Sequence, residues 1–162
     1  LTKKSAYSPI MPRKFDVVAR LKEEGPLCCC GNLRKAVRAV TQFYDEALRA
    51  SGVRASQLGL LATSNALGRA TMNRLADFMV MDRTTLTRNL RPLEKQGLVR
   101  VSRGADRRER EIIVTREGQE LLANAYPLWQ KAQTKVVSSF GQKRMQRFLS
   151  DLSAIVVVVQ GE

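Results

Sequence analysis

Hydrophobic residues recur along most of this chain at intervals of three and four positions, the spacing that places side chains on one face of an α-helix. The spacing predicts a helix over residues 28–51. Its apolar face consists of Leu33, Val37, Val40, Tyr44 and Leu48. Gly52 follows as the predicted C-cap. Ser56 is the predicted N-cap of a second helix, which Gly68 ends.

Two shorter helices follow a short predicted strand, and the link between them is tight. The first helix is predicted to begin at Thr71 and the second at Asp82, and Gly97 ends the second. Their apolar positions are Met72, Leu75, Ala76 and Met79 in the first helix and Leu86, Leu90 and Leu93 in the second. Pro92 removes one backbone hydrogen bond from the second helix, but the leucine spacing continues through it. We therefore expect a bend at this proline and not a break.

The period then changes from helical to alternating. The sequence predicts a short strand over residues 98–101, a charged turn over residues 102–109 and a return strand over residues 112–114, which together form a β-hairpin. Two short helices followed at once by a small hairpin are the elements of a helix-turn-helix with a wing.

Two longer helices are predicted after the hairpin. Thr115 is the predicted cap of the first, which Gly141 ends, and the second covers residues 142–159. The last helix carries an apolar stripe of Met145, Phe148, Leu149, Leu152, Ile155 and Val156. Either a partner chain or a contact within the chain buries this stripe.

Residues 1–26 have no clean period, and we expect an extended arm with a short helical stretch over residues 15–22. The predicted fold class is therefore mainly α with a small β-hairpin wing (α+β).

The chain carries a formal charge of +13 at pH 7, from 28 Lys and Arg against 15 Asp and Glu. This balance favours a polyanionic partner, nucleic acid first and an anionic membrane second.

Histidine is absent, which excludes a Ser-His-Asp or Cys-His enzyme and removes the commonest metal ligand. We therefore expect no enzyme activity, no cofactor and no metal. No signal peptide is recognisable and the apolar run over residues 155–159 is too short to span a bilayer, so we expect a cytoplasmic protein without a membrane partner.

The helix that begins at Asp82 presents a polar face suited to the major groove of DNA. Its predicted DNA-binding residues are Arg83, Thr84, Thr85, Thr87, Arg88 and Arg91. Arg can donate to both O6 and N7 of guanine, and Thr can contact a phosphate, a base edge or a thymine methyl group. The predicted DNA-binding residues of the hairpin are Arg103, Arg107, Arg108 and Arg110, whose guanidinium groups suit the negative potential of the minor groove. A non-specific architectural DNA-binding protein shares this charge but needs no mixed face of Thr and Arg.

Three stretches of the chain carry a family resemblance. Leu75–Val99 reads LADFMVMDRTTLTRNLRPLEKQGLV, Gly104–Arg108 reads GADRR, and Ile112–Gly118 reads IIVTREG. Together they resemble the DNA-binding core of the MarR family, and the resemblance covers roughly residues 28–159. It implies one domain over residues 27–159, with a winged helix-turn-helix core over residues 55–114 and dimerisation helices over residues 28–51 and 115–159.

The resemblance implies an obligate homodimer that presents two recognition helices and two wings to a palindromic operator in double-stranded DNA. It also implies a repressor that a small aromatic or phenolic molecule releases from that operator. Candidate residues for an aromatic pocket, or for ordinary core, are Trp129, Phe43 and Tyr44. By the same resemblance, Arg108 enters the minor groove, and Asp106 forms a salt bridge with a nearby Arg that holds the wing in shape. Pro92 departs from most of the family, which bears on the path of the recognition helix.

Three consecutive cysteines, Cys28, Cys29 and Cys30, stand at the start of the first long helix. Their number and spacing suit neither a disulfide framework nor a structural zinc site. A thiolate in the first turn of a helix is favoured by the helix dipole, and some MarR-like repressors sense organic hydroperoxides through a cysteine in this helix. The run is therefore a candidate redox site. The alternatives are small buried apolar residues and the lining of a ligand pocket.

Overall fold

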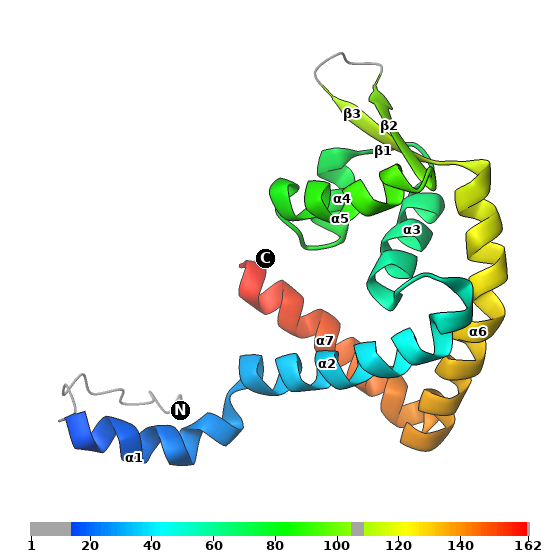
Figure 1. The fold of residues 1–162 in the computed structure, drawn as a ribbon. Helices are drawn as coiled ribbons and strands as arrows, with labels where there is room; N and C mark the ends of the chain where they lie inside the picture. Colours follow the sequence, from blue (N-terminus) through cyan, green and yellow to red (C-terminus); the bar gives the residue numbers. More distant parts are fainter. Residues whose placement is uncertain (1–13, 105–108, 162) are drawn as a thin grey trace. The chain divides into compact units, whose positions relative to one another are not determined.

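The structure is a computed structural model that describes residues 14–104 and 109–161 of the chain. The chain divides into two compact units, residues 1–40 and residues 41–162. Helix α2 (Cys29–Leu48) begins in the first unit and ends in the second (Figure 1). Within the described ranges, no helix combines the length and the apolar character needed to cross a membrane.

The first unit contains helix α1 (Lys14–Glu24) and a 3₁₀ turn, η1 (Gly25–Leu27), ahead of the first turns of α2. The helical stretch expected over residues 15–22 is therefore longer in the structure, and this part of the predicted extended arm is helical. Pro26 lies at the start of η1. Because a proline disfavours α-helical geometry in the residue before it, Pro26 explains why α1 does not continue.

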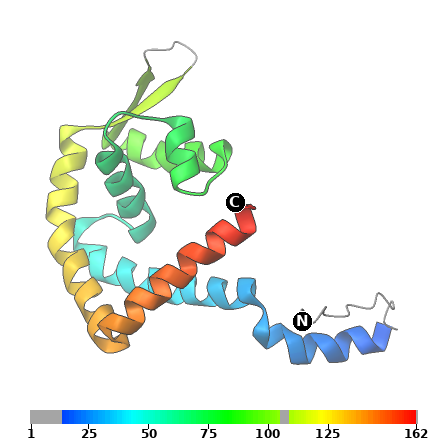
Figure 2. The ribbon, with the colours of Figure 1, turned by 180° about the vertical axis from the view of Figure 1, so that it is seen from behind.

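The second unit is mainly helical and contains one small antiparallel sheet, as the sequence predicts (Figure 1, Figure 2). After the end of α2 come η2 (Arg49–Ser51), α3 (Ala55–Leu67), β1 (Ala70–Thr71), α4 (Met72–Phe78), α5 (Arg83–Lys95), β2 (Val99–Arg103), β3 (Arg110–Val114), α6 (Arg116–Phe140) and α7 (Gln142–Gln160). The three strands are arranged in the order β1-β3-β2. Both views show β2 and β3 extending away from α4 and α5, so the predicted winged helix-turn-helix is confirmed.

Strands β2 and β3 form the predicted hairpin. Val99 faces Val114 at the base of the hairpin, and Arg103 faces Arg110 at its far end. Val99 and Ile112 are at most 2% exposed, whereas Arg103 and Arg110 are exposed. The base of the hairpin is therefore fixed by burial against the helices, and its far end projects into solvent.

The core of the second unit lies between α3, α4, α5 and the sheet. Its buried members are Leu60, Leu61, Met72, Leu75, Ala76, Leu86, Leu90, Leu93, Leu98, Val99, Ile112 and Val114. Leu86, Leu90 and Leu93 of α5 are at most 2% exposed, so the predicted inward face of this helix is confirmed. Burial of each of these leucines contributes about 1.5–3 kcal/mol to folding. Helix α3 contacts α5, α6 and β3 and is therefore the central helix of the unit.

The predicted cap at Thr115 is confirmed, and Thr71 and Asp82, where two helices are predicted to begin, are N-caps as well. The side-chain oxygens of Thr71, Asp82 and Thr115 each accept a hydrogen bond from the backbone N–H three residues further on, at 3.2, 2.8 and 3.1 Å. These bonds satisfy donors that the start of a helix leaves unpaired. Helix α5 also continues through Pro92 to its end, as the leucine spacing predicts.

The prediction that Ser56 caps α3 is wrong. The helix begins at Ala55 with Arg54 in the N-cap position, so Ser56 lies inside the first turn. The N–H of Arg54 donates to Gln57 Oε1 at 3.1 Å, and the N–H of Ala55 donates to Asp45 Oδ1 at 2.7 Å. Asp45 belongs to α2 and precedes Ala55 by ten positions, so a local pattern could not identify this cap.

A junction at the start of α6 ties this long helix to the hairpin. Thr115 Oγ1 donates to the carbonyl of Gly97 at 2.6 Å, and the N–H of Thr115 donates to the carbonyl of Leu98 at 3.0 Å. The Cα atom of Gly118 packs against the backbone carbonyl of Leu98. A Cβ on Gly118 would be 2.2 Å from the carbonyl oxygen of Leu98 and 2.8 Å from Val114 Cγ1, so only glycine fits. We call Gly97, Leu98, Thr115 and Gly118 the wing junction.

Replacing Gly118 with Ala is expected to lower the free energy of unfolding by about 1–3 kcal/mol, since the added methyl group overpacks against a backbone carbonyl. Chemical unfolding followed by circular dichroism measures the change. Gly59→Ala is the matched control, because Gly59 also lies in a helix but has no atom within 4 Å of the position of an added Cβ. The control is expected to be neutral or slightly stabilising. Equal unfolding free energies for Gly118→Ala and the unchanged protein would contradict this role of the junction.

Candidate functional site

Five of the six predicted recognition-helix residues are exposed on α5. These are Arg83, Thr84, Thr87, Arg88 and Arg91. The buried leucines occupy the opposite side of the same helix. Three guanidinium groups therefore stand on the solvent side of α5, where a polyanion can reach them.

Thr85, the sixth predicted residue, has a different environment. It is half-buried, and its hydroxyl donates to Asp82 Oδ2 at 2.7 Å while its N–H donates to Oδ1. These hydrogen bonds lower the pKa of Asp82 below its usual value. Because a lowered pKa favours the carboxylate in the folded protein, the cap stabilises α5 at neutral pH and is lost in acid, as the pH falls through that lowered pKa. Thr85 thus holds the start of the recognition helix in place.

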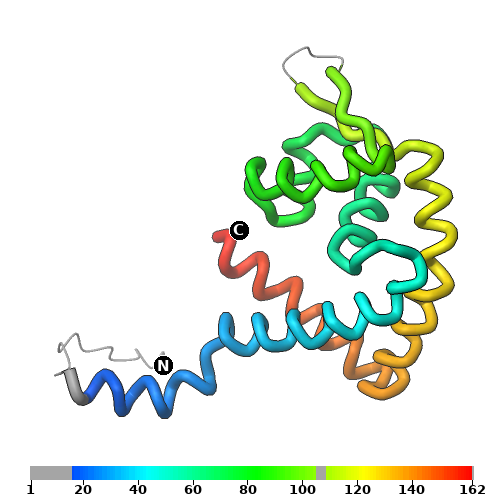
Figure 3. Tube along the Cα trace, viewed as in Figure 1, coloured from blue at the N-terminus to red at the C-terminus, as the bar shows by residue number. Residues whose placement is uncertain are grey.

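The link between α4 and α5 contains a strained residue. Val80 has a φ of 52°, in the left-handed region that β-branched residues rarely adopt. The N–H groups of Val80 and Met81 donate to the carbonyls of Asp77 and Ala76 at 3.1 and 2.9 Å, and these bonds hold the turn. The tube in Figure 3 follows this link from α4 into α5. The sequence predicts the position of the link but not its strain, because a left-handed residue is usually signalled by Gly or Asn.

The described part of the wing is basic. Arg103 and Arg110 are exposed and stand directly opposite each other across the hairpin. Like charges in this arrangement repel each other, and an anion beside them relieves the repulsion. The predicted wing residues Arg107 and Arg108, and Asp106 as the partner in a salt bridge, lie outside the described residues.

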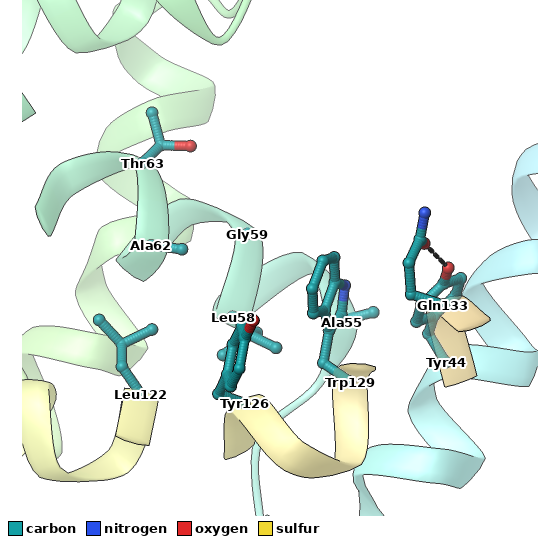
Figure 4. Close-up of a pocket in the computed structure, with 10 residues that line it drawn as sticks. All are labelled: Tyr44, Ala55, Leu58, Gly59, Ala62, Thr63, Leu122, Tyr126, Trp129 and Gln133. Atoms are coloured by element: carbon teal, nitrogen blue, oxygen red, sulfur yellow. Dashed lines mark hydrogen bonds between the residues drawn. The ribbon is translucent and has the colours of Figure 1, made fainter. Parts of the chain in front are cut away.

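The cysteine run lies at the start of α2, within the first unit. Cys28, Cys29 and Cys30 are all exposed, so the interpretation as small buried residues does not hold for the single chain. The N–H of Gly31 donates to Cys28 Sγ at 3.4 Å, which places this sulfur where a helix cap normally lies. None of the three lines the pocket of Figure 4, so that alternative is not supported either.

A pocket of about 660 Å³ lies between α3, α6 and the end of α2 (Figure 4). Its lining consists of Tyr44, Ala55, Leu58, Gly59, Ala62, Thr63, Leu122, Tyr126, Trp129 and Gln133. Trp129 and Tyr44, two of the aromatic residues considered for a pocket, are therefore part of its wall. Phe43 is not, and it lies under the Lys135 ammonium group, 5.7 Å from the centre of the ring. The size and the mainly apolar lining suit a small organic molecule.

One polar pair stands in this apolar wall. The hydroxyl of Tyr44 donates to Gln133 Oε1, as the dashed line in Figure 4 marks. Burial raises the pKa of Tyr44, so its hydroxyl stays neutral at physiological pH. The sequence does not reveal Gln133, because a lone glutamine on a long amphipathic helix carries no spacing signal.

The apolar stripe of α7 is uncovered in the single chain. Four of its members, Phe148, Leu149, Ile155 and Val156, are between 36% and 52% exposed. The helix then ends in Val157, Val158 and Val159, which are 45% to 76% exposed. Contiguous apolar surface of this kind marks an interaction site in soluble proteins.

The chain is similar to known DNA-binding regulators. Residues 54–109 match the model of the MarR family. The M. tuberculosis transcriptional regulator MosR, solved in complex with DNA, is 39% identical with a TM-score of 0.73, and the match covers 82% of this chain and 98% of that one. The repressor CouR of Rhodococcus jostii RHA1, bound to a 23-mer DNA duplex, shares the fold at 21% identity and a TM-score of 0.73, over 82% and 95% of the two chains. The HTH-type transcriptional regulator YwoH of Bacillus subtilis (strain 168) is 22% identical over 116 residues, 72% of this chain and 85% of that protein.

Replacing Arg88 or Arg91 with Ala is expected to weaken binding to a specific DNA site by about 1–3 kcal/mol, because each guanidinium group is exposed where it can contact a base edge. Fluorescence anisotropy on the specific duplex and on a scrambled duplex measures the change. Lys131→Ala, which removes an exposed charge from α6, is the control for loss of positive charge alone. An equal loss of affinity on both duplexes would assign the arginine to phosphate contact and contradict base readout.

Proposed function

Because this chain belongs to the MarR family of DNA-binding transcriptional regulators, which are not enzymes, we propose that it acts as a homodimeric repressor that a small aromatic molecule releases from a palindromic operator. The observation that carries the proposal is the aromatic pocket between α3, α6 and the end of α2. Helix α3 lines this pocket and also contacts α5. A ligand in the pocket therefore touches the helix that supports the recognition helix.

The DNA contacts are assigned to two elements. On the proposed dimer, residues 55–114 of each protomer form the DNA-binding core, and α5 enters the major groove. The wing reaches the adjacent minor groove with Arg103 and Arg110 and, by resemblance to the family, with Arg107 and Arg108. The formal charge of +13 supports this assignment, because a protein that neutralises several phosphates binds through the release of counterions.

Dimerisation is assigned to the helices over residues 28–51 and 115–159. The uncovered stripe of α7 supports this role, since a second copy of the chain offers an equal apolar stripe in return. Two protomers related by a two-fold axis present two recognition helices to the two halves of a palindrome. The symmetry of the operator thus follows from the symmetry of the protein.

The release of DNA by an aromatic ligand is supported by the pocket and by two relatives of similar fold. CouR of Rhodococcus jostii RHA1 has been solved with p-coumaroyl-CoA, and DNA binding by BpsR of Bordetella bronchiseptica is regulated by 6-hydroxynicotinic acid. Both ligands contain a six-membered aromatic ring. In this chain, Tyr44, Tyr126 and Trp129 offer aromatic surface to such a ring. A ligand that binds better to the conformation that does not fit DNA shifts the population toward that conformation and lowers the affinity for DNA.

A thiol switch is the second candidate, and the position of Cys28 favours it. Its sulfur is exposed to solvent, where a hydroperoxide can reach it, and it accepts the N–H of Gly31. The thiolate would attack an organic hydroperoxide, break the O–O bond and give a cysteine sulfenic acid and the alcohol after proton uptake. The oxidised side chain is larger and more polar, which changes the start of α2.

Leu149→Glu is expected to convert the dimer into monomers, because it places a charge in the centre of the apolar stripe of α7. Sedimentation velocity measures the molecular mass, and DNA binding is expected to weaken at the same time. Ser150→Glu is the matched control, since Ser150 is exposed and lies beside the stripe rather than within it. A Leu149→Glu protein that remains a dimer would contradict the assignment of this stripe to the interface.

Release of DNA tests the proposed function directly. The DNA is the segment upstream of the protein's own gene, and fluorescence anisotropy follows binding with reducing agent, with a panel of small aromatic molecules, or with an organic hydroperoxide. Release by an aromatic molecule under reducing conditions supports the ligand-responsive repressor. If only the hydroperoxide releases the DNA, and a thiol reductant restores binding, the thiol switch replaces the ligand-responsive repressor as the proposed mechanism. Binding without preference over scrambled DNA would contradict both and favour an architectural protein.

A further inference from the structure

We propose that the pocket selects an uncharged planar aromatic ligand over its carboxylate analogue, with Tyr44 and Gln133 as the pair that recognises its polar group. The inference rests on the proposed function, because it names the class of ligand for the same pocket. It goes further in stating which chemistry the pocket accepts and which it rejects. Three observations carry it, namely the charge of the lining, the shape of the cavity and the Tyr44–Gln133 hydrogen bond.

The lining has no charge to balance an anion. Among the residues that the structure describes, no Lys, Arg, Asp or Glu lines the pocket. An acidic side chain contacts one lining residue from behind, since Asp45 Oδ1 accepts the N–H of Ala55 at 2.7 Å. Lys135 is two positions beyond Gln133 on α6, but its ammonium group lies over the ring of Phe43, outside the lining. A carboxylate that enters this pocket loses its hydration without gaining a cation, and such a transfer is strongly unfavourable.

The shape of the pocket suits a flat ring. Figure 4 shows Tyr126 and Trp129 projecting from α6, and their ring centres are 5.9 Å apart with a tilt of 31° between the ring planes. Helix α3 contributes small residues to the lining, Ala55, Gly59 and Ala62, at positions that share one face of the helix. No atom lies within 4 Å of the place that a Cβ on Gly59 would occupy. Small residues on one helix and aromatic rings on the other leave a slot between them.

The polar pair specifies the remaining contact. Because the hydroxyl of Tyr44 donates to Gln133 Oε1, these two half-buried side chains pair with each other when the pocket is empty. The amide NH₂ of Gln133 and the oxygen lone pairs of Tyr44 remain free to bond a ligand carbonyl and a ligand N–H or O–H. A neutral amide or phenol matches this set of donors and acceptors. A carboxylate offers only acceptors and brings a charge that the pair cannot neutralise.

The test uses two probes with the same ring system, 2-naphthamide and 2-naphthoate at pH 7.4, which differ in charge and in the N–H donors of the amide. Trp129 is the single tryptophan of the chain, so its indole N–H gives one NMR signal that reports on the pocket. Titration of the full chain with each probe is expected to shift this signal with an affinity at least tenfold higher for 2-naphthamide. Equal or tighter binding of 2-naphthoate, or no shift with either probe, would overturn the inference.

Two variants test the residues. Gln133→Leu and Tyr44→Phe keep the volume of the side chains and remove one polar group each, and both are expected to weaken 2-naphthamide binding by about tenfold. Gln130→Leu, an exposed position on the same helix, is the matched control and is expected to bind as the unchanged protein does. Full affinity in both pocket variants would overturn the role of the pair. DNA release by 2-naphthamide is measured separately, so selective binding without release would support this inference and contradict the proposed function.

Discussion

The close contact between Gly118 and the backbone of Leu98 is the constraint on which the second unit depends. Leu98 follows the recognition helix, Thr115 follows the second strand of the wing, and Gly118 lies in the first turn of α6. The wing junction therefore fixes three elements with a few backbone atoms, and no side chain intervenes at the closest point. Because α6 also carries Tyr126, Trp129 and Gln133, the helix that forms one wall of the pocket is anchored to the base of the wing.

Two environments of opposite character share this scaffold. The outer face of α5 and the far end of the hairpin expose arginines to solvent, whereas the pocket between α3 and α6 is apolar and uncharged among the described residues. Helix α3 lies between them, with Leu60 and Leu61 in the core beside α5 and the sheet, and Ala55, Leu58 and Gly59 in the lining of the pocket. A change on either side of α3 is felt on the other, since a close-packed core transmits displacement. One helix of thirteen residues therefore joins the pocket to the core behind α5, and the proposed regulation would act through it.

Much of this fold follows from patterns that act over a few residues. The leucine spacing of α5, the helix starts at Thr71, Asp82 and Thr115 and the alternation of β2 and β3 are all local signals, and the structure confirms them. The features that the sequence did not predict depend on residues far apart in the chain. Asp45 caps a helix that begins ten positions later, and Gln133 acquires its role only because Tyr44 lies opposite. Val80 adopts its left-handed conformation because the packing of two helices overrides the preference of the residue itself.

The valine run near the end of α7 bears on how the single chain behaves in solution. Val157, Val158 and Val159 follow two further β-branched residues, and all five are at least 36% exposed in the single chain. Such a segment has high β-propensity, carries no charge and contains no proline, which is the composition of aggregation-prone stretches. A chain that leaves this segment uncovered is therefore at risk of aggregation, so whatever covers the end of α7 also protects the chain from self-association.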